Sequence, residues 1–269
     1  MILHVRATEK NFGNWVAAEG VRRNLPACRS VDFRDVTRRD LDDCRAVVCG
    51  GGGWLTAYAE PFWRDLAESR AEHVILWGLG MCEGRRSTKP LDPAVFRGVA
   101  SRLTLAAVRD DWTRDHLGID NLEILFCPAC LFWEDRQSVG SALLHVWHKQ
   151  LLPAAKRGRL LGRMLTITHG EPRRRILATY ARAGLVVASR YHGAICAHSL
   201  GLPHVLINRD VKFQAYAAQW DGGPFVLIDE LDELEAAIER CRGMNRQRVD
   251  LGPNLDFAGR VNGLLAELG

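Results

Sequence analysis

Residues 185–212 constrain the fold more than any other part of the sequence. A short apolar strand, 185–188, leads into the polar segment Ser189-Arg190-Tyr191-His192-Gly193, and a helix of small residues, 194–200, follows. Gly201-Leu202-Pro203 ends that helix, because glycine accepts a left-handed cap and proline cannot continue a helix. A second strand, 205–207, and an exit loop, 208–212, come next. This order predicts one step of a doubly wound parallel sheet.

The same stretch predicts a binding site. Arg190 and His192 follow the first strand and Lys212 follows the second. Ligands of open parallel sheets lie at the carboxyl ends of the strands, and a helix N-terminus between two cations attracts an anion. Imidazole titrates near neutrality, so the stretch predicts a site for an anion that undergoes proton transfer. The alternative for His192 is a histidine that caps the helix or packs against it.

The first half of the chain opens with the same alternation. Residues 2–5 predict a strand, residues 11–14 a polar loop and residues 15–25 a helix. A strand at 45–49 is followed by Gly50, Gly51, Gly52 and Gly53, hereafter the glycine turn. Bare glycine amides can line an anion-binding nest, whereas the alternative is a tight, close-packed turn. The pattern is neither G-x-G-x-x-G nor a Walker motif, so it implies no nucleotide.

Three further strands are predicted in this half, at 73–77, 103–108 and 123–127. Arg109 stands at the end of the second of these, and a short helix is expected at 112–117. A guanidinium group suits bidentate contacts to carboxylate or phosphate, so Arg109 is a candidate ligand residue. The alternative is a salt bridge to Asp110 or Asp111.

The second half repeats the alternation of strands and helices after a polar linker near 132–141. Strands are expected at 142–147, 164–167, 185–188, 205–207 and 225–228, and helices at 213–220, 231–242 and 257–268. We therefore expect an α/β protein with two Rossmann-like domains, residues 1–137 and 138–250. A terminal helix within 251–269 is expected to cross back to the first domain.

Several of these pieces resemble the polysaccharide pyruvyl transferase family. S-R-Y-H-G, the small-residue helix, G-L-P and N-R-D-V-K (208–212) are similar to its C-terminal signature. Upstream, the glycine turn, the G-L-G step at 78–80 and V-R-D around Arg109 are similar to other family motifs. The resemblance implies two domains facing across a cleft, as in glycosyltransferase-B-like proteins. It also implies transfer of a pyruvyl group from phosphoenolpyruvate to two hydroxyls of a sugar in a cell-surface or exopolysaccharide precursor, with formation of a ketal.

The resemblance also assigns roles to residues. Arg109 and Lys212, with Arg190 and the glycine amides, would hold the donor, and His192 would be the acid and base. The family commonly reads N-x-G-D where this chain has Asn11-Phe12-Gly13-Asn14. The amide of Asn14 can orient an acceptor hydroxyl but cannot take its proton. A helix N-cap is the alternative for Asn14.

Composition excludes several classes of function. The chain has 269 residues, 47% of them hydrophobic and 25% charged, which is typical of globular domains. A net charge of +4 without basic runs interleaved with aromatics argues against nucleic acid. Without a leader-like or spanning segment, we expect a cytoplasmic protein. Expected partners are phosphoenolpyruvate and a sugar or lipid-linked oligosaccharide acceptor. The lipid-linked case would add peripheral contact with the inner face of the membrane. No metal and no further cofactor is expected.

The other chemically reactive residues are interpreted as structural. Eight dispersed cysteines indicate small buried hydrophobes, and Cys127-x-x-Cys130 lacks the partners of a zinc site or a redox motif. His145 and His148 lack metal-pair spacing. His169 is expected to be a polar turn residue, with a residue of the cleft as the alternative. The basic loop 82–90 and the arginines 173–175 are interpreted as solvated, with ligand or membrane contact as the alternative.

Two other functions stay open. A nucleotide-sugar glycosyltransferase of the same fold would need a carboxylate aimed at a ribose, and only Glu230 comes close to that position. A non-catalytic glycan- or anion-binding protein is favoured by Asn14 and by the short chain.

Overall fold

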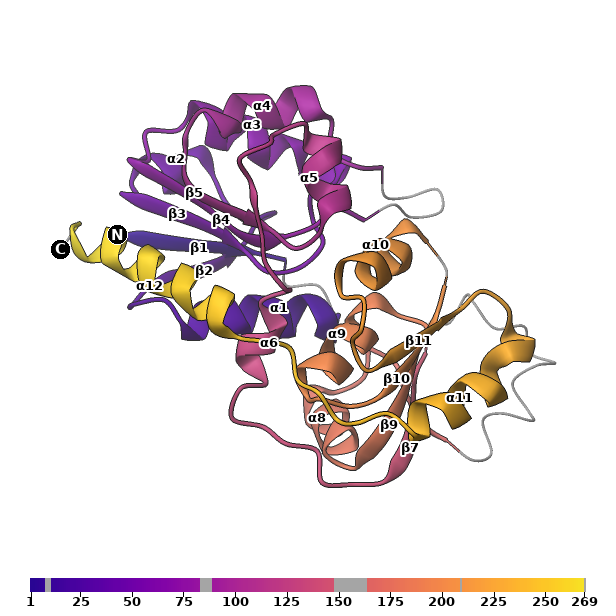
Figure 1. Ribbon diagram of the computed structural model, residues 1–269. Coiled ribbons are helices and arrows are strands. Elements are labelled where there is room, and N and C mark those ends of the chain that lie inside the picture. The colour runs from indigo at the N-terminus through magenta and orange to yellow at the C-terminus, as the bar shows by residue number, and fades with distance from the viewer. Residues whose placement is uncertain (8–10, 83–88, 148–163, 209, 269) are drawn as a thin grey trace. The chain divides into compact units, whose positions relative to one another are not determined.

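The computed structural model describes residues 1–7, 11–82, 89–147, 164–208 and 210–268. The chain forms two parallel sheets flanked by helices, which confirms the predicted α/β class with two Rossmann-like halves (Figure 1). Contacts divide it into two units. Unit 1 comprises Met1–Glu9, Asn14–Phe132 and Asp250–Gly269, and unit 2 comprises Lys10–Gly13 and Trp133–Val249. The predicted arrangement of the halves across a cleft stays a prediction.

Unit 1 contains a six-stranded sheet in the order β2-β1-β3-β4-β5-β6. Its strands are β1 (Ile2–Arg6), β2 (Arg29–Asp32), β3 (Ala46–Gly50), β4 (His73–Leu79), β5 (Leu103–Val108) and β6 (Glu123–Ile124). All neighbouring pairs are parallel, and β3 is buried along its whole length, as expected of a central strand covered on both faces. The predicted strand at 123–127 is wrong beyond Ile124, because the chain leaves the sheet edge before Pro128.

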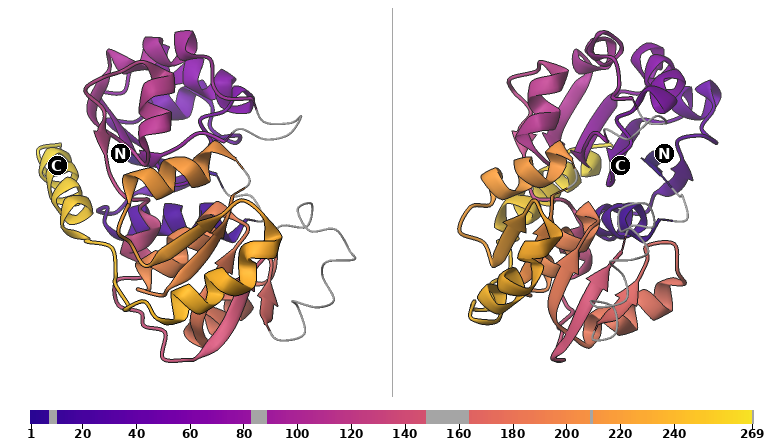
Figure 2. Two further views of the ribbon diagram at one scale, coloured as in Figure 1. Left: turned by 45° about the vertical axis from the view of Figure 1, so that its right-hand side comes forward. Right: turned by 90° about the vertical axis from the view of Figure 1, so that its right-hand side faces the viewer.

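Helices cover both faces of this sheet (Figures 1 and 2). They are α1 (Phe12–Arg23), α2 (Arg38–Asp42), α3 (Glu60–Glu68), α4 (Pro93–Ala100), α5 (Asp111–Leu117), α6 (Ala129–Phe132) and α12 (Gly252–Ala266), with the 3-10 turn η1 (Ala57–Ala59). Trp63 of α3 and Phe96 of α4 belong to one core cluster with Leu76 of β4. Trp77, the next residue of β4, packs against Phe257 of α12, with ring centroids 5.3 Å apart.

The terminal helix α12 is held in unit 1 by polar contacts. The buried Asn254 amide donates to the Phe126 carbonyl at 3.0 Å, and its oxygen accepts from Trp77 Nε1 at 3.4 Å. The helix begins at Gly252, before the predicted start at Phe257. Pro253 is tolerated in the first turn, and Asp250 accepts the Gly252 N–H at 2.9 Å.

Unit 2 contains a five-stranded parallel sheet in the order β11-β10-β9-β7-β8. Its strands are β7 (Ala142–Val146), β8 (Leu165–Ile167), β9 (Ala183–Ala188), β10 (His204–Ile207) and β11 (Phe225–Ile228). Its helices are α8 (Arg173–Ala181), α9 (Tyr191–Ser199), α10 (Val211–Gln219) and α11 (Leu234–Arg242), with the 3-10 turn η2 (Leu231–Glu233). Within the described residues, no helix has both the length and the apolarity that a membrane crossing needs.

Both sheets share one topology. Starting from β8, unit 2 has its second strand at the edge, then its first, third, fourth and fifth, and β2-β1-β3-β4-β5 follow the same order in unit 1. In this order the winding reverses between the first and third strands, and ligands of such sheets bind outside the carboxyl ends at that switch point. The topology therefore singles out the carboxyl ends of β1 and β3 in unit 1, and of β7 and β9 in unit 2.

Candidate functional site

The switch point of unit 2 contains Arg190 and His192. The strand β9 ends at Ala188, Ser189 is buried, and Arg190 is the N-cap residue of α9, with φ −126° and ψ 135°. The predicted helix start at residue 194 is therefore wrong, because Tyr191, His192 and Gly193 form the first turn of α9. Tyr191 is buried, which favours the early start of the helix. The helix in turn fixes the backbone of His192.

Arg190 connects the two strands of this switch point. Its Nε donates to the Trp147 carbonyl at 3.1 Å, and Trp147 directly follows β7. Burial lowers the pKa of the Arg190 guanidinium, which nevertheless stays a cation at neutral pH. A fixed positive charge thus stands at the N-terminus of α9, which suits an anionic ligand.

The half-buried imidazole of His192 lies against the backbone of Gly13. A Cβ added at Gly13 would lie 2.6 Å from His192 Cβ and closer still to Cγ and Nδ1 of the ring. Lys10–Gly13 is grouped with unit 2, and the Phe12 N–H donates to the His169 carbonyl at 2.8 Å. Sequence reasoning missed Gly13 as a site residue, although its place in the N-F-G-N motif was the available signal.

The predicted loop at 11–14 is also wrong. Phe12, Gly13 and Asn14 belong to the first turn of α1, and the Asn11 side chain accepts the Gly13 N–H at 3.0 Å. Asn11, and not Asn14, therefore supplies the capping oxygen. The N-cap alternative for Asn14 is excluded by this geometry.

His169 lies in a turn, as the sequence predicted, but it is buried there. Its side chain is 2% exposed, and its ring centroid lies 5.6 Å from that of Phe12. Burial, and secondarily the charge of Arg190, lower the pKa of His169 to about 3. The imidazole of His169 is therefore neutral at physiological pH.

Lys212 follows β10, the neighbour of β9 in the sheet. It lies in the first turn of α10 and not in an exit loop as predicted, because Asp210 caps the helix and accepts the Lys212 N–H at 3.0 Å. The ammonium group lies 3.2 Å from the Asp210 carboxylate. Arg209, in the predicted loop, is outside the described residues.

The switch point of unit 1 contains the glycine turn. Gly51 and Gly52 have φ values of 77° and 96°, which disfavour any other residue. A Cβ at Gly51 would lie 2.6 Å from Ala18 Cα, so α1 packs directly on the turn. The Gly51 N–H donates to the Trp77 carbonyl at 3.1 Å and is not available to an anion, which contradicts that part of the predicted nest. The close-packed alternative describes Gly51 best.

Asn14 faces the glycine turn. Its side chain is nearly buried, and its Oδ1 lies 3.5 Å from the Gly53 N–H, a long and therefore weak hydrogen bond. A Cβ at Gly52 would lie 3.1 Å from the same oxygen. Asn14 and residues 52–53 thus form one polar corner at the switch point.

Arg109 follows β5, but its guanidinium extends to the ends of β3 and β4. A Cβ at Gly53 would lie 3.2 Å from Nη2, and one at Gly80 would lie 2.5 Å from Cζ. The side chain is 1% exposed and pairs with Asp110 at 3.2 Å, while Nη2 donates to the Met81 carbonyl at 2.9 Å. The salt bridge that the sequence left as an alternative is present. Access of a ligand to this guanidinium is limited by the two glycine segments.

The structure describes several of the residues that were interpreted as structural. Among the described residues, no group of three or more His, Cys, Asp or Glu side chains could hold a metal ion. Cys127 and Cys130 are both buried, and burial raises the pKa of Cys127. Arg173, Arg174 and Arg175 are exposed on α8. His148 and most of the basic loop at 82–90 lie outside the described residues.

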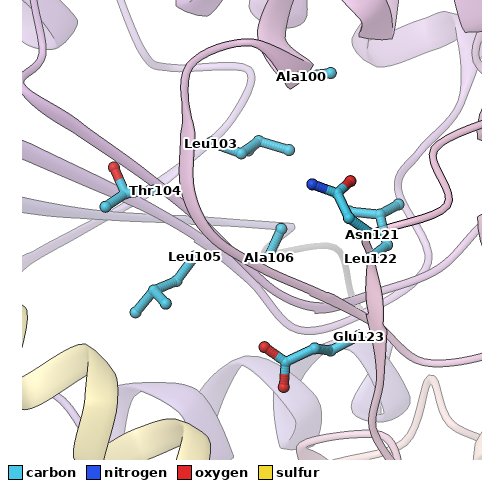
Figure 3. A pocket seen from close by; sticks show the side chains of 8 residues that line it. All are labelled: Ala100, Leu103, Thr104, Leu105, Ala106, Asn121, Leu122 and Glu123. Carbon is cyan, nitrogen blue, oxygen red and sulfur yellow. The ribbon is translucent and has the colours of Figure 1, made fainter.

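One cavity lies elsewhere on unit 1 (Figure 3). It measures about 150 Å³ and is lined by β5 and the segment that leads into β6, including Leu105 and Glu123. The cavity contains none of the predicted site residues. It lies beside the sheet edge and not at the switch point.

Three comparisons relate the chain to known proteins. A family model described as polysaccharide pyruvyl transferase matches residues 11–166 and 159–211. No curated protein matches the chain. The crystal structure of a functionally uncharacterized protein from Klebsiella pneumoniae is similar, with a TM-score of 0.55 and 16% identity over 85% of this chain and 92% of that one. Two-electron reduced Megasphaera elsdenii flavodoxin has a TM-score of 0.27 and 18% identity, over 40% of this chain and 83% of its own.

Proposed function

This chain belongs to the polysaccharide pyruvyl transferase family, and from this premise we propose that it transfers a pyruvyl group from phosphoenolpyruvate to two hydroxyls of one sugar. The product is a cyclic ketal, and inorganic phosphate is released. The observation that carries the proposal, beside the family match, is the pair Arg190 and His192 at the switch point of unit 2. An imidazole beside a fixed cation suits an anionic donor that must be protonated.

The proposed chemistry moves two protons in balance. The methylene carbon of the enol takes one proton, so that the adjacent carbon becomes an oxocarbenium-like centre that one sugar hydroxyl attacks with loss of its proton. The second hydroxyl then displaces phosphate from the same carbon and also loses a proton. One of these two protons replaces the one given to the methylene carbon, and the other leaves with phosphate.

His192 is the proposed group for the proton transfers, because its type of side chain both gives and takes a proton near neutrality. Arg190, Lys212 and the N-terminus of α9 are proposed to hold the carboxylate and phosphate of the donor and to stabilise developing charge. Arg109 is proposed to contribute from unit 1 by fixing residues 53 and 80 at the switch point. The reaction calls for no metal and no cofactor beyond the donor substrate.

Asn14 is proposed to orient an acceptor hydroxyl, since an amide cannot remove its proton. It is also the observation that favours a non-catalytic glycan-binding protein as the second candidate. A nucleotide-sugar glycosyltransferase is less well supported, because the carboxylate of Glu230 serves in a capping box with Glu233.

Two measurements test the proposal. Thermal-shift titration with phosphoenolpyruvate, a nucleotide sugar and a glycan separates the three functions by which compound raises Tm. Phosphate release from phosphoenolpyruvate in the presence of free and lipid-linked glycans then separates an enzyme from a binding protein. Stabilisation by a nucleotide sugar alone would overturn the proposal.

The role of His192 is tested by His192→Ala. We expect phosphate release to be abolished, while the Tm shift caused by phosphoenolpyruvate largely survives. His73→Ala is the matched control. His73 is the first residue of β4 in unit 1, so it lies at the amino end of its strand, whereas both switch points lie at the carboxyl ends of strands. Wild-type turnover in His192→Ala would remove this residue from the mechanism.

A further inference from the structure

An exposed aromatic side chain lies near the switch point of unit 1. Tyr58, in η1, is 63% exposed although it is large and apolar over most of its surface. The segment that carries it is fixed by its backbone: the Ala57 N–H donates to the Lys89 carbonyl and the Ala59 N–H to the Thr56 carbonyl, both at 2.9 Å. Tyr58 is thus presented to solvent by a rigid turn.

Two buried aromatic rings hold Tyr58 in its orientation. Its ring meets Phe33 edge-on, with centroids 5.9 Å apart and an interplanar angle of 83°. Phe33 in turn stacks on Trp54 at 5.1 Å, with an angle of only 1°. Because Phe33 and Trp54 are both buried, the orientation of Tyr58 is constrained before any ligand arrives.

Tyr58, Phe33 and Trp54, hereafter the aromatic column, are connected to the glycine turn. Trp54 directly follows that turn, and its Nε1 donates to the Gly51 carbonyl at 3.0 Å. Phe33 directly follows β2, and its N–H donates at 2.9 Å to the carbonyl of Arg6, the last residue of β1. The column therefore stands at the carboxyl ends of the strands, where ligands of this topology bind.

A polar group is fixed next to the column. The guanidinium of Arg34 forms a bidentate pair with the buried carboxylate of Asp32, at 2.8 and 3.0 Å. Its carbon Cζ lies 5.9 Å from the Phe33 ring centroid, and the side chain is 40% exposed. Planar N–H donors held in one orientation beside an exposed ring suit a ligand that has both an apolar face and hydroxyl groups.

We propose that Tyr58 and Arg34 form a sugar-binding subsite of unit 1, which takes a pyranose of the acceptor. The C–H face of the sugar ring stacks on Tyr58, while ring hydroxyls accept hydrogen bonds from Arg34. Such a contact removes apolar surface from water on both partners. Because the aromatic column already holds the Tyr58 ring in place, little side-chain entropy is lost when the sugar binds. The inference rests on the proposed function only in naming this sugar as the acceptor.

The test uses the full chain and saturation-transfer NMR with the methyl glycosides of glucose, galactose and mannose as probes. We expect transfer to the ring protons of at least one glycoside with the wild-type protein. Tyr58→Ala should weaken that affinity by about tenfold, as the loss of one aromatic contact implies. Tyr58→Trp should retain it, and Arg34→Gln should weaken it.

The control is Val139→Ala, because Val139 of unit 2 is 87% exposed and tests for nonspecific apolar contact. Absence of transfer with all three glycosides, or equal transfer with wild type and Tyr58→Ala, would overturn the subsite. Thermal-shift titration with phosphoenolpyruvate on the same variants distinguishes the two proposals. Tyr58-dependent sugar binding without any response to phosphoenolpyruvate would retain the subsite and reject the proposed reaction.

Discussion

Replacing Gly13 with alanine tests the geometry around His192. Gly13 lies in α1 without a left-handed φ, so its backbone accepts alanine. The added methyl group would lie 2.6 Å from His192 Cβ, whereas carbon atoms prefer separations of about 3.5 Å or more. The imidazole must therefore move by roughly 1 Å.

The expected effects on stability and activity differ in size. Alanine improves helix propensity by up to about 1 kcal/mol, and overpacking costs about 1–3 kcal/mol. Rotation of the His192 side chain does not move its Cβ, so the first turns of α1 and α9 must also shift. Because the gain in helix propensity partly offsets this overpacking, we expect a net loss of stability of at most about 2 kcal/mol. A displacement of about 1 Å of a catalytic group can reduce turnover by about a hundredfold. Gly13→Ala should therefore lose phosphate release far more than it loses stability.

The assay is phosphate release at saturating phosphoenolpyruvate, measured together with urea denaturation. Gly259→Ala in α12 is the matched control, since a Cβ there meets open space and should only stabilise the helix. Turnover near the wild-type value in Gly13→Ala would refute either the contact with His192 or the catalytic role of that residue.

A double-mutant cycle sharpens the result. In His192→Ala the ring atoms that the new methyl group meets are gone, but Cβ at 2.6 Å remains. Adding Gly13→Ala should therefore cost no further activity and less stability than it costs in the wild-type protein. The two substitutions should thus be strongly non-additive, as expected of groups in contact. Additive losses of stability would show that the ring of His192 takes no part in the clash.

Two further predictions follow from buried charges. Arg109→Ala should destabilise unit 1 by about 3–5 kcal/mol in urea denaturation, because it leaves the carboxylate of Asp110, itself 1% exposed, without its cation. Arg114→Ala is the control, because it removes a partly exposed ion pair and should cost less than about 1 kcal/mol. If Arg109→Ala instead weakens phosphoenolpyruvate binding and leaves stability unchanged, Arg109 contacts the donor directly. The second prediction is that the chain loses stability as the pH falls below 6.5. Burial lowers the pKa of five histidines to about 3 or 4, namely His4, His145, His169, His198 and His204. Between these values and 6.5 the unfolded chain binds more protons than the folded one, so each histidine should remove up to about 1.4 kcal/mol per pH unit. Denaturation curves at pH 7, 6 and 5 check this slope, and pH-independent midpoints would contradict the burial.

Most of the strands were predictable from the sequence, whereas the starts of several helices were not. Short apolar runs that end in polar or glycine segments identified most of the strands, because central strands of parallel sheets are buried on both faces. The helices α1, α9 and α10 begin inside motifs that were interpreted as loops. Arg190 precedes α9 without a side-chain capping bond, so the usual Ser, Thr or Asp signal is missing there.

The burial of Arg109 could not be predicted from local sequence. Its position after β5 indicated a ligand residue, but its environment is set by Gly53 and Gly80, which are distant in the chain. The neighbouring acids Asp110 and Asp111 were the local signal for an ion pair, and the structure pairs Arg109 with Asp110. The guanidinium of Arg109 occupies space that side chains at positions 53 and 80 would fill, and only the folded structure brings these distant positions together.

The shared topology of the two sheets clarifies which unit can perform the chemistry. Each sheet has a switch point, but the polar groups there differ in what they can do with a proton. In unit 1 the corner contains the amide of Asn14 and backbone N–H groups, none of which titrates near neutral pH. In unit 2 it contains His192 and the cation Arg190. If the proposed reaction is correct, proton transfer belongs to unit 2, while unit 1 is left to bind and orient a sugar. An exposed Tyr58 beside the glycine turn is what such a division of roles requires.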